Sequence, residues 1–430
     1  MWHQAGRHHR RNHRGWRFRG WERVRRGRFI SYDLQRLGNP FQTCKIPPQR
    51  SETGHCPRSL RADRGGYAVS VSTLEVSKAW PSRELEHERQ LFRAQFSPDG
   101  RWIAAGGQDK LVHLWELEND GKKALSGHDT WVSSLVFHPK EKKLFTADYL
   151  GVIYCWNYEK GDQPQWIIKE ADRDNVRALV VSKDGKHLIS AGDDAVIKVW
   201  KTSDGQQVAR MEGHEECIFS LALSPDGKQL VSGDLFGIVR QWSVGKWKQV
   251  RELDAKLLHT RKENFIADVG GVRSFAFSSD GSLLAVGGMK EAKSNAFCPG
   301  KPTVLVFDWA SGKVKTELGI KGKSDGPFNA LRFLEDGTLC GHTEILHSAS
   351  ELTFWKIDEP EPIHSIKNGS GYDLSLHPDK RQLLVPTYVT GGSSGNGGRG
   401  KTPENYLTNT TVLRIFSLFA KPEEKGDEKK

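Results

Sequence analysis

Cysteine and long apolar runs are both scarce in this chain. The six cysteines among 430 residues lie far apart and none forms a Cys-x-x-Cys pair, which argues against a cysteine-based zinc site and against a compact disulfide framework. No run of 18 apolar residues is long enough to span a membrane, and the basic N-terminus lacks the apolar segment of a secretory signal. We therefore expect a cytoplasmic protein without a membrane segment.

Acidic residues are few in the N-terminal part of the chain. Residues 1–75 carry 15 Arg and 1 Lys against 5 acidic residues, which accounts for the whole net charge of +11. The remaining residues balance at 48 basic and 48 acidic side chains. This shift in composition predicts an Arg-rich disordered segment over residues 1–70, a main domain over residues 71–420 and a charged tail over residues 421–430.

The N-terminal segment has two competing interpretations. Its stretch HHRRNHRGWRFRGWERVRRGRF, from His8 to Phe29, interleaves Arg with aromatic rings, a composition that can neutralise phosphates and stack on unpaired bases. Alternatively, no Met occurs between positions 2 and 210, so a bacterial-type start near Val69 or Val71 would make the upstream residues a translation artefact. Nucleic-acid binding is expected only if this segment exists in the native protein.

The domain is built from repeats. Four copies read FRAQFSPDGRWIAAGGQDKLVHLW, WVSSLVFHPKEKKLFTADYLGVIYCW, VRALVVSKDGKHLISAGDDAVIKVW and IFSLALSPDGKQLVSGDLFGIVRQW. Each alternates apolar and polar residues at the period of a β-strand, and turn residues such as Ser-Pro-Asp-Gly separate the first two strands. The terminal tryptophans are spaced 41, 44 and 42 residues apart, the period of a four-stranded propeller blade.

Three degenerate copies follow, with Phe307, Trp355 and Phe416 at the equivalent positions. The last copy lacks a fourth strand, so we predict that residues 71–80, VSTLEVSKAW, supply it and close the ring. The predicted fold is an all-β, seven-bladed β-propeller of four-stranded antiparallel blades, in which an N-terminal strand completes the last blade.

These repeats resemble the WD-repeat (WD40-type) family, and we expect a bacterial-type member of it. The resemblance implies a hydrogen-bonded network in each blade that links a His, a Ser or Thr, an Asp and the terminal Trp. Counting back 28, ten and six residues from each tryptophan predicts a partial network in each of the four regular blades. The predicted members are His87, Asp109, Trp115, His128, Thr146, Trp156, Ser190, Asp194, Trp200, His214, Ser232 and Trp242. On this count the second and fourth blades lack the Asp, and the third lacks the His.

The His, Ser and Asp of these networks could be mistaken for a hydrolytic triad. A catalytic group is needed once, whereas this pattern recurs from blade to blade, so we expect structural networks and no enzyme. No metal site and no cofactor is predicted.

One motif argues for an alternative function. GNGGRGKT, Gly395 to Thr402, matches the phosphate-loop pattern within a Gly-rich insertion over residues 391–402. Pro403 follows directly, and the residues before the next strand are too few for a crossover helix. We expect a hairpin insertion, with a nucleotide-binding protein or propeller enzyme as the alternative.

The resemblance implies a non-catalytic scaffold that binds other proteins on one face of the ring, and we expect it to act as a monomer. Family positions carried onto this chain predict a set of partner-binding residues rich in aromatic and Arg side chains, which are typical interface anchors. The candidates are Gln90, Phe92, Trp131, Tyr149, Arg177, Asp193, Phe219 and Leu235.

Overall fold

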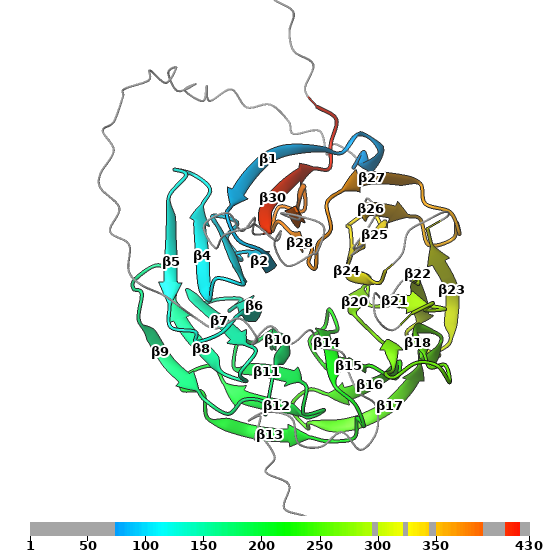
Figure 1. Ribbon diagram of the computed structural model, residues 1–430, viewed down its shortest axis with the longest axis horizontal. Helices are drawn as coiled ribbons and strands as arrows, with labels where there is room; N and C mark the ends of the chain where they lie inside the picture. Colours follow the sequence, from blue (N-terminus) through cyan, green and yellow to red (C-terminus); the bar gives the residue numbers. More distant parts are fainter. Residues whose placement is uncertain (1–73, 295–299, 321–325, 344–349, 390–408, 422–430) are drawn as a thin grey trace, which may run out of the picture.

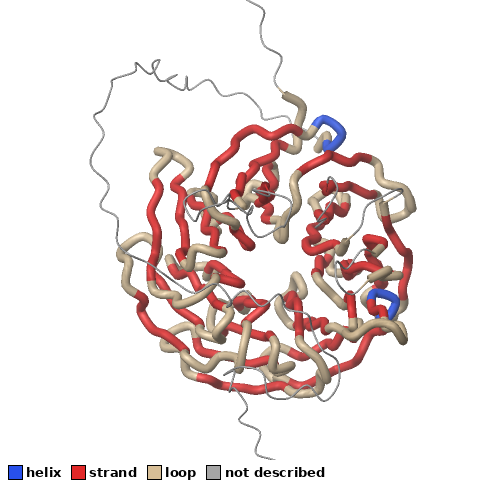
Figure 2. The backbone as a smooth tube through the Cα atoms, viewed as in Figure 1, coloured by secondary structure: helices blue, strands red, loops and turns tan. Residues whose placement is uncertain are grey.

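Seven sheets radiate around one axis in the computed structural model (Figure 1), which describes residues 74–294, 300–320, 326–343, 350–389 and 409–421. Each sheet has four antiparallel strands and forms one blade. The predicted all-β, seven-bladed propeller is confirmed. In the backbone trace strands dominate the ring, and the described helical segments are two short 3-10 turns, η2 (Val76–Lys78) and η3 (Lys256–Leu258) (Figure 2).

The strands run outward from the axis in chain order within the first six blades. Blade 1 contains β2 (Leu91–Phe96), β3 (Trp102–Gly107), β4 (Leu111–Glu116) and β5 (Lys122–Ser126). Blade 2 contains β6 (Val132–Phe137), β7 (Lys143–Asp148), β8 (Ile153–Asn157) and β9 (Pro164–Ile168). Blade 3 contains β10 (Val176–Val181), β11 (His187–Gly192), β12 (Ile197–Lys201) and β13 (Gln207–Met211). Blade 4 contains β14 (Ile218–Leu223), β15 (Gln229–Asp234), β16 (Ile238–Ser243) and β17 (Lys248–Asp254).

The degenerate copies form the remaining blades. Blade 5 contains β20 (Ser274–Phe277), β21 (Leu283–Lys290), β22 (Lys301–Asp308) and β23 (Val314–Gly319). Blade 6 contains β24 (Phe328–Phe333), β25 (Leu339–Thr343), β26 (Ser350–Trp355) and β27 (His364–Asn368). Blade 7 contains β28 (Ser375–Leu376), β29 (Gln382–Val389), β30 (Thr410–Ser417) and β1 (Trp80–His87). A two-stranded ribbon, β18 (His259–Thr260) with β19 (Val269–Gly270), lies between blades 4 and 5 in the chain.

The outermost strand of blade 7 comes from the N-terminal side of the chain, but it is not the segment that the sequence predicted. The strand is β1, which pairs antiparallel with β30 from Trp80 opposite Ser417 to His87 opposite Thr411 (Figure 1). Most of residues 71–80 precede it, and η2 lies there instead of a strand. An outermost strand has one unpaired edge and half-buried side chains, so β1 tolerates Pro81 and shows little apolar alternation.

The apolar core is divided into clusters between neighbouring blades. One cluster joins blade 1 to blade 2 around Trp156, and another joins blade 7 to blade 1 through Leu413 and Ile415. Equivalent clusters fill the other five gaps around the ring. Each blade therefore buries both of its faces against its neighbours, as in other closed propellers.

The tight turns between the first two strands follow from their sequence. In blade 1, the Ser97 hydroxyl accepts a hydrogen bond from the Trp102 amide, and Asp99 accepts one from the Arg101 amide. Gly100 takes a φ of +73°, which L-residues with a side chain rarely adopt. These local bonds fix the register of the two strands that the turn joins.

Several segments discussed above lie outside the described residues. They are the Arg-rich segment to residue 73, the Gly395 to Thr402 run, and the tail from residue 422. Among the described residues, no helix has the length and apolar character needed to cross a bilayer.

Candidate partner-binding face and the networks behind it

Blade 2 holds a buried four-member hydrogen-bonded network. The Trp156 indole N–H donates to the Thr146 hydroxyl oxygen at 2.8 Å, and that hydroxyl lies 2.7 Å from His128 Nε2. His128 Nδ1 lies 2.8 Å from a carboxylate oxygen of Asp148. Since a carboxylate can only accept, the Nδ1–H donates to Asp148, and Nε2 is left to accept the hydroxyl proton. Blade 4 repeats the network with Trp242, Ser232, His214 and Asp234 at 2.8, 2.6 and 2.7 Å.

The sequence prediction that these two blades lack the Asp is therefore wrong. Asp148 and Asp234 are the last residues of β7 and β15, eight residues before the tryptophan instead of six. Each carboxylate also accepts backbone N–H bonds from its following turn, as Asp148 does from Leu150 and Val152 at 2.9 and 3.0 Å. The signal that could have found them is an acidic residue two places after the hydroxyl residue.

Blade 3 differs because Asp172 stands where blades 2 and 4 have His. Trp200 still donates to Ser190 at 2.9 Å, but Asp194 pairs with Lys198 Nζ at 2.5 Å. The predicted chain from Ser190 through Asp194 to Trp200 is thus corrected to two separate interactions. Burial, together with the Asp194 carboxylate, raises the pKa of Asp172 to about 7.

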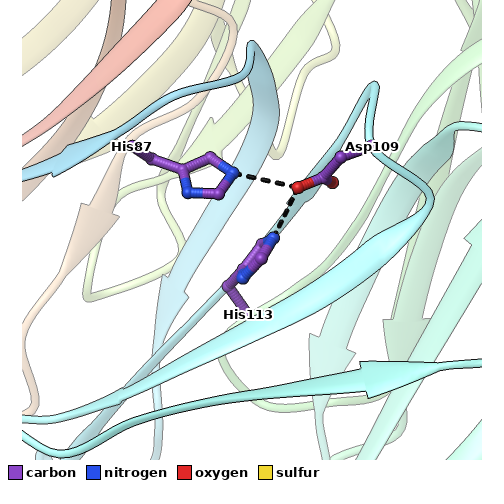
Figure 3. Close-up of side chains that lie close together, drawn as sticks. All are labelled: His87, Asp109 and His113. Atoms are coloured by element: carbon purple, nitrogen blue, oxygen red, sulfur yellow. Dashed lines mark hydrogen bonds and ion pairs between the residues drawn. The ribbon is translucent and has the colours of Figure 1, made fainter. Parts of the chain in front are cut away.

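Blade 1 brings two histidines onto one carboxylate (Figure 3). His87 Nε2 and His113 Nε2 lie 3.0 and 2.6 Å from the same oxygen of Asp109. The predicted pair of His87 and Asp109 is present, but Ala105 has no hydroxyl to accept a bond from Trp115. Burial acts to raise the pKa of Asp109, and the hydrogen bonds from the two imidazoles outweigh it and hold that pKa well below its usual range. Among the described residues, these three form a group whose donor atoms lie close enough together to hold a metal ion. The sequence analysis missed His113.

One predicted set of partner-binding residues forms an aromatic cluster. The Phe92 ring centroid lies 5.6 Å from that of Trp131, 6.4 Å from that of Tyr149 and 5.6 Å from that of Tyr372. Tyr149 is 41% exposed, and the other three rings are half-buried. The cluster joins blades 1, 2 and 7, and Tyr372 was not predicted because blade 7 has no terminal tryptophan from which to count.

Arginines line the pocket at the axis of the ring. Arg93, Arg177, Arg273 and Arg332 all contribute to it. The guanidinium groups of Arg177 and Arg273 lie 4.9 and 3.9 Å from the Phe219 ring centroid, a favourable cation–π geometry. Arg93 donates to the Tyr372 carbonyl at 2.8 Å, which links the arginines to the aromatic cluster.

The other predicted residues divide by burial. Asp193 pairs with Arg177 beside the pocket. Gln90, Phe219 and Leu235 are buried at 4, 5 and 2% exposure. Gln90 accepts hydrogen bonds from Gln108 and Asn409, and Leu235 belongs to a small cluster with Cys217 and Phe219. Of these three residues, Phe219 also lines the pocket.

Four segments of the chain match one family of repeats. The family described as "WD domain, G-beta repeat" matches residues 80–116, 121–157, 163–201 and 205–243. Each match begins with the outermost strand of one blade and continues through the first three strands of the next, so the first match starts at β1 in blade 7.

Curated WD-repeat relatives match parts of the chain. "Target of rapamycin complex subunit wat1" of Schizosaccharomyces pombe is 25% identical over 37% of this chain and 53% of its own length. "Nuclear distribution protein nudF" of Aspergillus terreus is 28% identical over 24% and 32%. The matches therefore span about half or less of these relatives. Both are eukaryotic and give no support to the bacterial-type interpretation.

Proposed function

We propose that this protein, whose four WD40 repeats lie within a closed seven-bladed ring, is a non-catalytic scaffold that binds other proteins on the face bearing the aromatic cluster. The first relative is named as a subunit of a complex. The observation that carries the proposal is the grouping of Phe92, Trp131, Tyr149 and Tyr372 next to the arginine-lined pocket. Large rings and Arg side chains supply most of the binding free energy at protein interfaces.

The charges suggest the chemistry of the partner. Four arginines line the pocket against Asp373, and Asp193 is paired beside it. An acidic segment of a partner protein would complement the pocket electrostatically, while an apolar side chain next to it would pack on the aromatic cluster. We propose such a segment as the ligand of this face.

We further propose a cytoplasmic monomer. Cys155, Cys217 and Cys340 are buried and unpaired, and burial raises the pKa of each thiol to about 12. Such thiols are protonated and inert in a reducing compartment.

The test compares two exposed positions on the ring. Tyr149→Ser removes the exposed ring of the cluster, and Val250→Ser removes a 54% exposed apolar side chain from β17 at the periphery. Proteins captured by the full chain are quantified by mass spectrometry for both variants, and binding of the recovered partner is measured by calorimetry. We expect Tyr149→Ser to weaken binding about tenfold and Val250→Ser to leave it unchanged.

Trp131→Ala is the stronger variant of the same test. It should leave the melting temperature nearly unchanged and weaken capture further, because the Trp131 ring is larger and contacts both Phe92 and Tyr149. Equal capture by wild type, Tyr149→Ser and Trp131→Ala would reject this face as the docking site.

A further inference from the structure

The donor atoms of His87, Asp109 and His113 converge from two neighbouring blades, blade 7 and blade 1. His87 ends β1, Asp109 lies in the turn after β3, and His113 lies on β4 (Figure 3). One ligand atom from each residue lies within 4.8 Å of the other two. The side chains are largely buried, at 8, 14 and 6% exposure.

The structural network of the repeat does not account for this arrangement. In blades 2 and 4 the His directs Nε2 to a hydroxyl and Nδ1 to an Asp at the strand end. Blade 1 has Ala105 and Gly107 at those two positions, so His87 directs Nε2 to Asp109 instead. A second imidazole, His113, stands where the other regular blades have Tyr154, Lys198 and Arg240.

Blade 3 gives the closest internal comparison. Its Asp194 occupies the place of Asp109 and is neutralised by Lys198, four residues on. In blade 1 the residue four places after Asp109 is His113, which is not a permanent cation. Two imidazole nitrogens and a carboxylate oxygen therefore share a buried space that another positive charge would stabilise.

We propose that His87 Nε2, His113 Nε2 and Asp109 Oδ2 bind a divalent transition metal ion, with Zn²⁺ as the preferred ion. Zinc binds imidazole nitrogen and carboxylate oxygen at about 2.0–2.2 Å, so tetrahedral ligand atoms lie about 3.3 Å apart. The 3.0 Å separation of His87 and Asp109 is close to this spacing, and the 2.6 Å separation of His113 and Asp109 must widen slightly. Mg²⁺ and Ca²⁺ prefer sets made of oxygen atoms and are disfavoured here.

The surroundings hold the ligands in place. The Leu111 amide donates to the other Asp109 oxygen at 3.3 Å and orients the carboxylate. The Trp115 ring lies against both imidazoles, with centroid distances of 6.2 Å to His87 and 5.7 Å to His113. Three protein ligands leave a fourth position for water.

Lys122 opposes metal binding and so provides a second test. Its Nζ lies 3.3 Å from His87 Nδ1, and an ammonium can only donate, so Nδ1 is the acceptor in this contact. Coordination through Nε2 needs the proton on Nδ1, and Lys122 must then move away. Its side chain is exposed and can do so. Removing Lys122 should therefore tighten metal binding.

The experiment is calorimetric titration of the untagged, chelator-treated full chain with Zn²⁺. Residues 1–73 contain five histidines, His3, His8, His9, His13 and His55, so the site is identified as the difference between wild type and variants. His113→Tyr introduces the residue that blade 2 carries at this position, and His187→Gln is the control for loss of a half-buried histidine elsewhere.

We expect wild type and His187→Gln to bind one more Zn²⁺ than His113→Tyr, and Lys122→Ala to bind it several-fold more tightly. Co²⁺ should give tetrahedral visible absorption bands in wild type that are lost in His113→Tyr. If His113→Tyr fails to fold, Asp109→Asn replaces it, with the Zn²⁺-dependent rise in melting temperature as the readout. Equal stoichiometry and affinity in wild type and the ligand variant would overturn the proposal.

Discussion

Blades 2 and 4 share one buried network, and blades 1 and 3 depart from it together. In blades 2 and 4 the Asp ends the second strand and connects through His and a hydroxyl to the tryptophan. In blades 1 and 3 glycine occupies that strand end, and the Asp lies in the turn two residues later. There it pairs with His113 or Lys198, each four residues further along the chain.

The difference shows that a carboxylate near the end of the second strand of a blade can have two roles. At the strand end it orients a histidine and caps a turn, so its contribution is structural. In the turn the Asp is not connected to the tryptophan, and it contacts ionisable side chains instead. A blade whose Asp lies two positions later therefore has a charged cluster in place of the fixed network. Binding of protons or ions can change the charge of such a cluster.

Removing the Asp from the buried network of blade 2 should reduce stability the most. Asp148→Ala leaves the His128 Nδ1–H and the Leu150 and Val152 amides without their acceptor at a site that is 1% exposed. We expect a loss of about 3–5 kcal/mol in the free energy of unfolding, measured by urea denaturation. Asp162→Ala, in an exposed turn of the same blade, should change it by less than about 0.5 kcal/mol.

Asp109→Ala is the matched change in blade 1. Its carboxylate is more exposed, at 14%, and its hydrogen bonds to His87, Leu111 and His113 are only partly buried, whereas the bond between Asp148 and His128 is fully buried. A smaller destabilisation than that of Asp148→Ala is expected. If the two variants lose equal stability, the distinction between the blade types fails.

The charged cluster of blade 3 should make the free energy of unfolding depend on pH. The pKa of Asp172 is raised from 3.8 to about 7 in the folded protein, so the folded state holds a proton that the unfolded state releases. Below about pH 4 the Asp172 carboxyl is protonated in both states and does not lower the free energy of unfolding. As the pH rises to about 7, the unfolded state loses this proton first, so Asp172 lowers the free energy of unfolding increasingly. Asp172→Asn removes the penalty and should be more stable than wild type above pH 7 by about 2–4 kcal/mol, the upper value corresponding to the full shift in pKa.

The measurement is urea denaturation of wild type and Asp172→Asn between pH 4 and pH 8. The two stability curves should converge at the acid end and separate as pH rises. Asp174→Asn, an exposed neighbour, serves as the control and should follow wild type throughout. A constant offset between Asp172→Asn and wild type would show that Asp172 does not titrate in this window.

The fold was predictable because the repeat encodes it several times. Terminal tryptophans at blade spacing and alternating strands recur in all four regular copies, and a Ser-x-Asp-Gly turn recurs in three of them, so errors in one copy do not change the result. The closing strand was misplaced because β1 lies at the edge and is only half-buried, which leaves little apolar alternation to locate it.

The side-chain networks were less predictable than the strands. Counting a fixed six residues back from the tryptophan identifies Asp109 and Asp194 but misses Asp148 and Asp234, because a carboxylate can reach this corner from either the strand end or the turn. The partners that complete blade 1 and the aromatic cluster, His113 and Tyr372, come from positions that the repeat pattern leaves variable. Such residues are identified by contacts across strands and not by spacing.

Restoring one hydroxyl of the network in blade 1 should change stability only slightly. Ala105 aligns with Thr146 and Ser232, and it lies opposite His113 as Thr146 lies opposite Tyr154. In Ala105→Ser a new hydroxyl would accept from the Trp115 indole, with a gain of about 0.5–1 kcal/mol in the free energy of unfolding.

Ala104→Ser buries the same hydroxyl one residue earlier on the opposite face of β3 and should instead cost about 1–3 kcal/mol. Urea denaturation of both variants separates the two cases, and equal destabilisation would mean that blade 1 has lost the geometry of the network along with its hydroxyl.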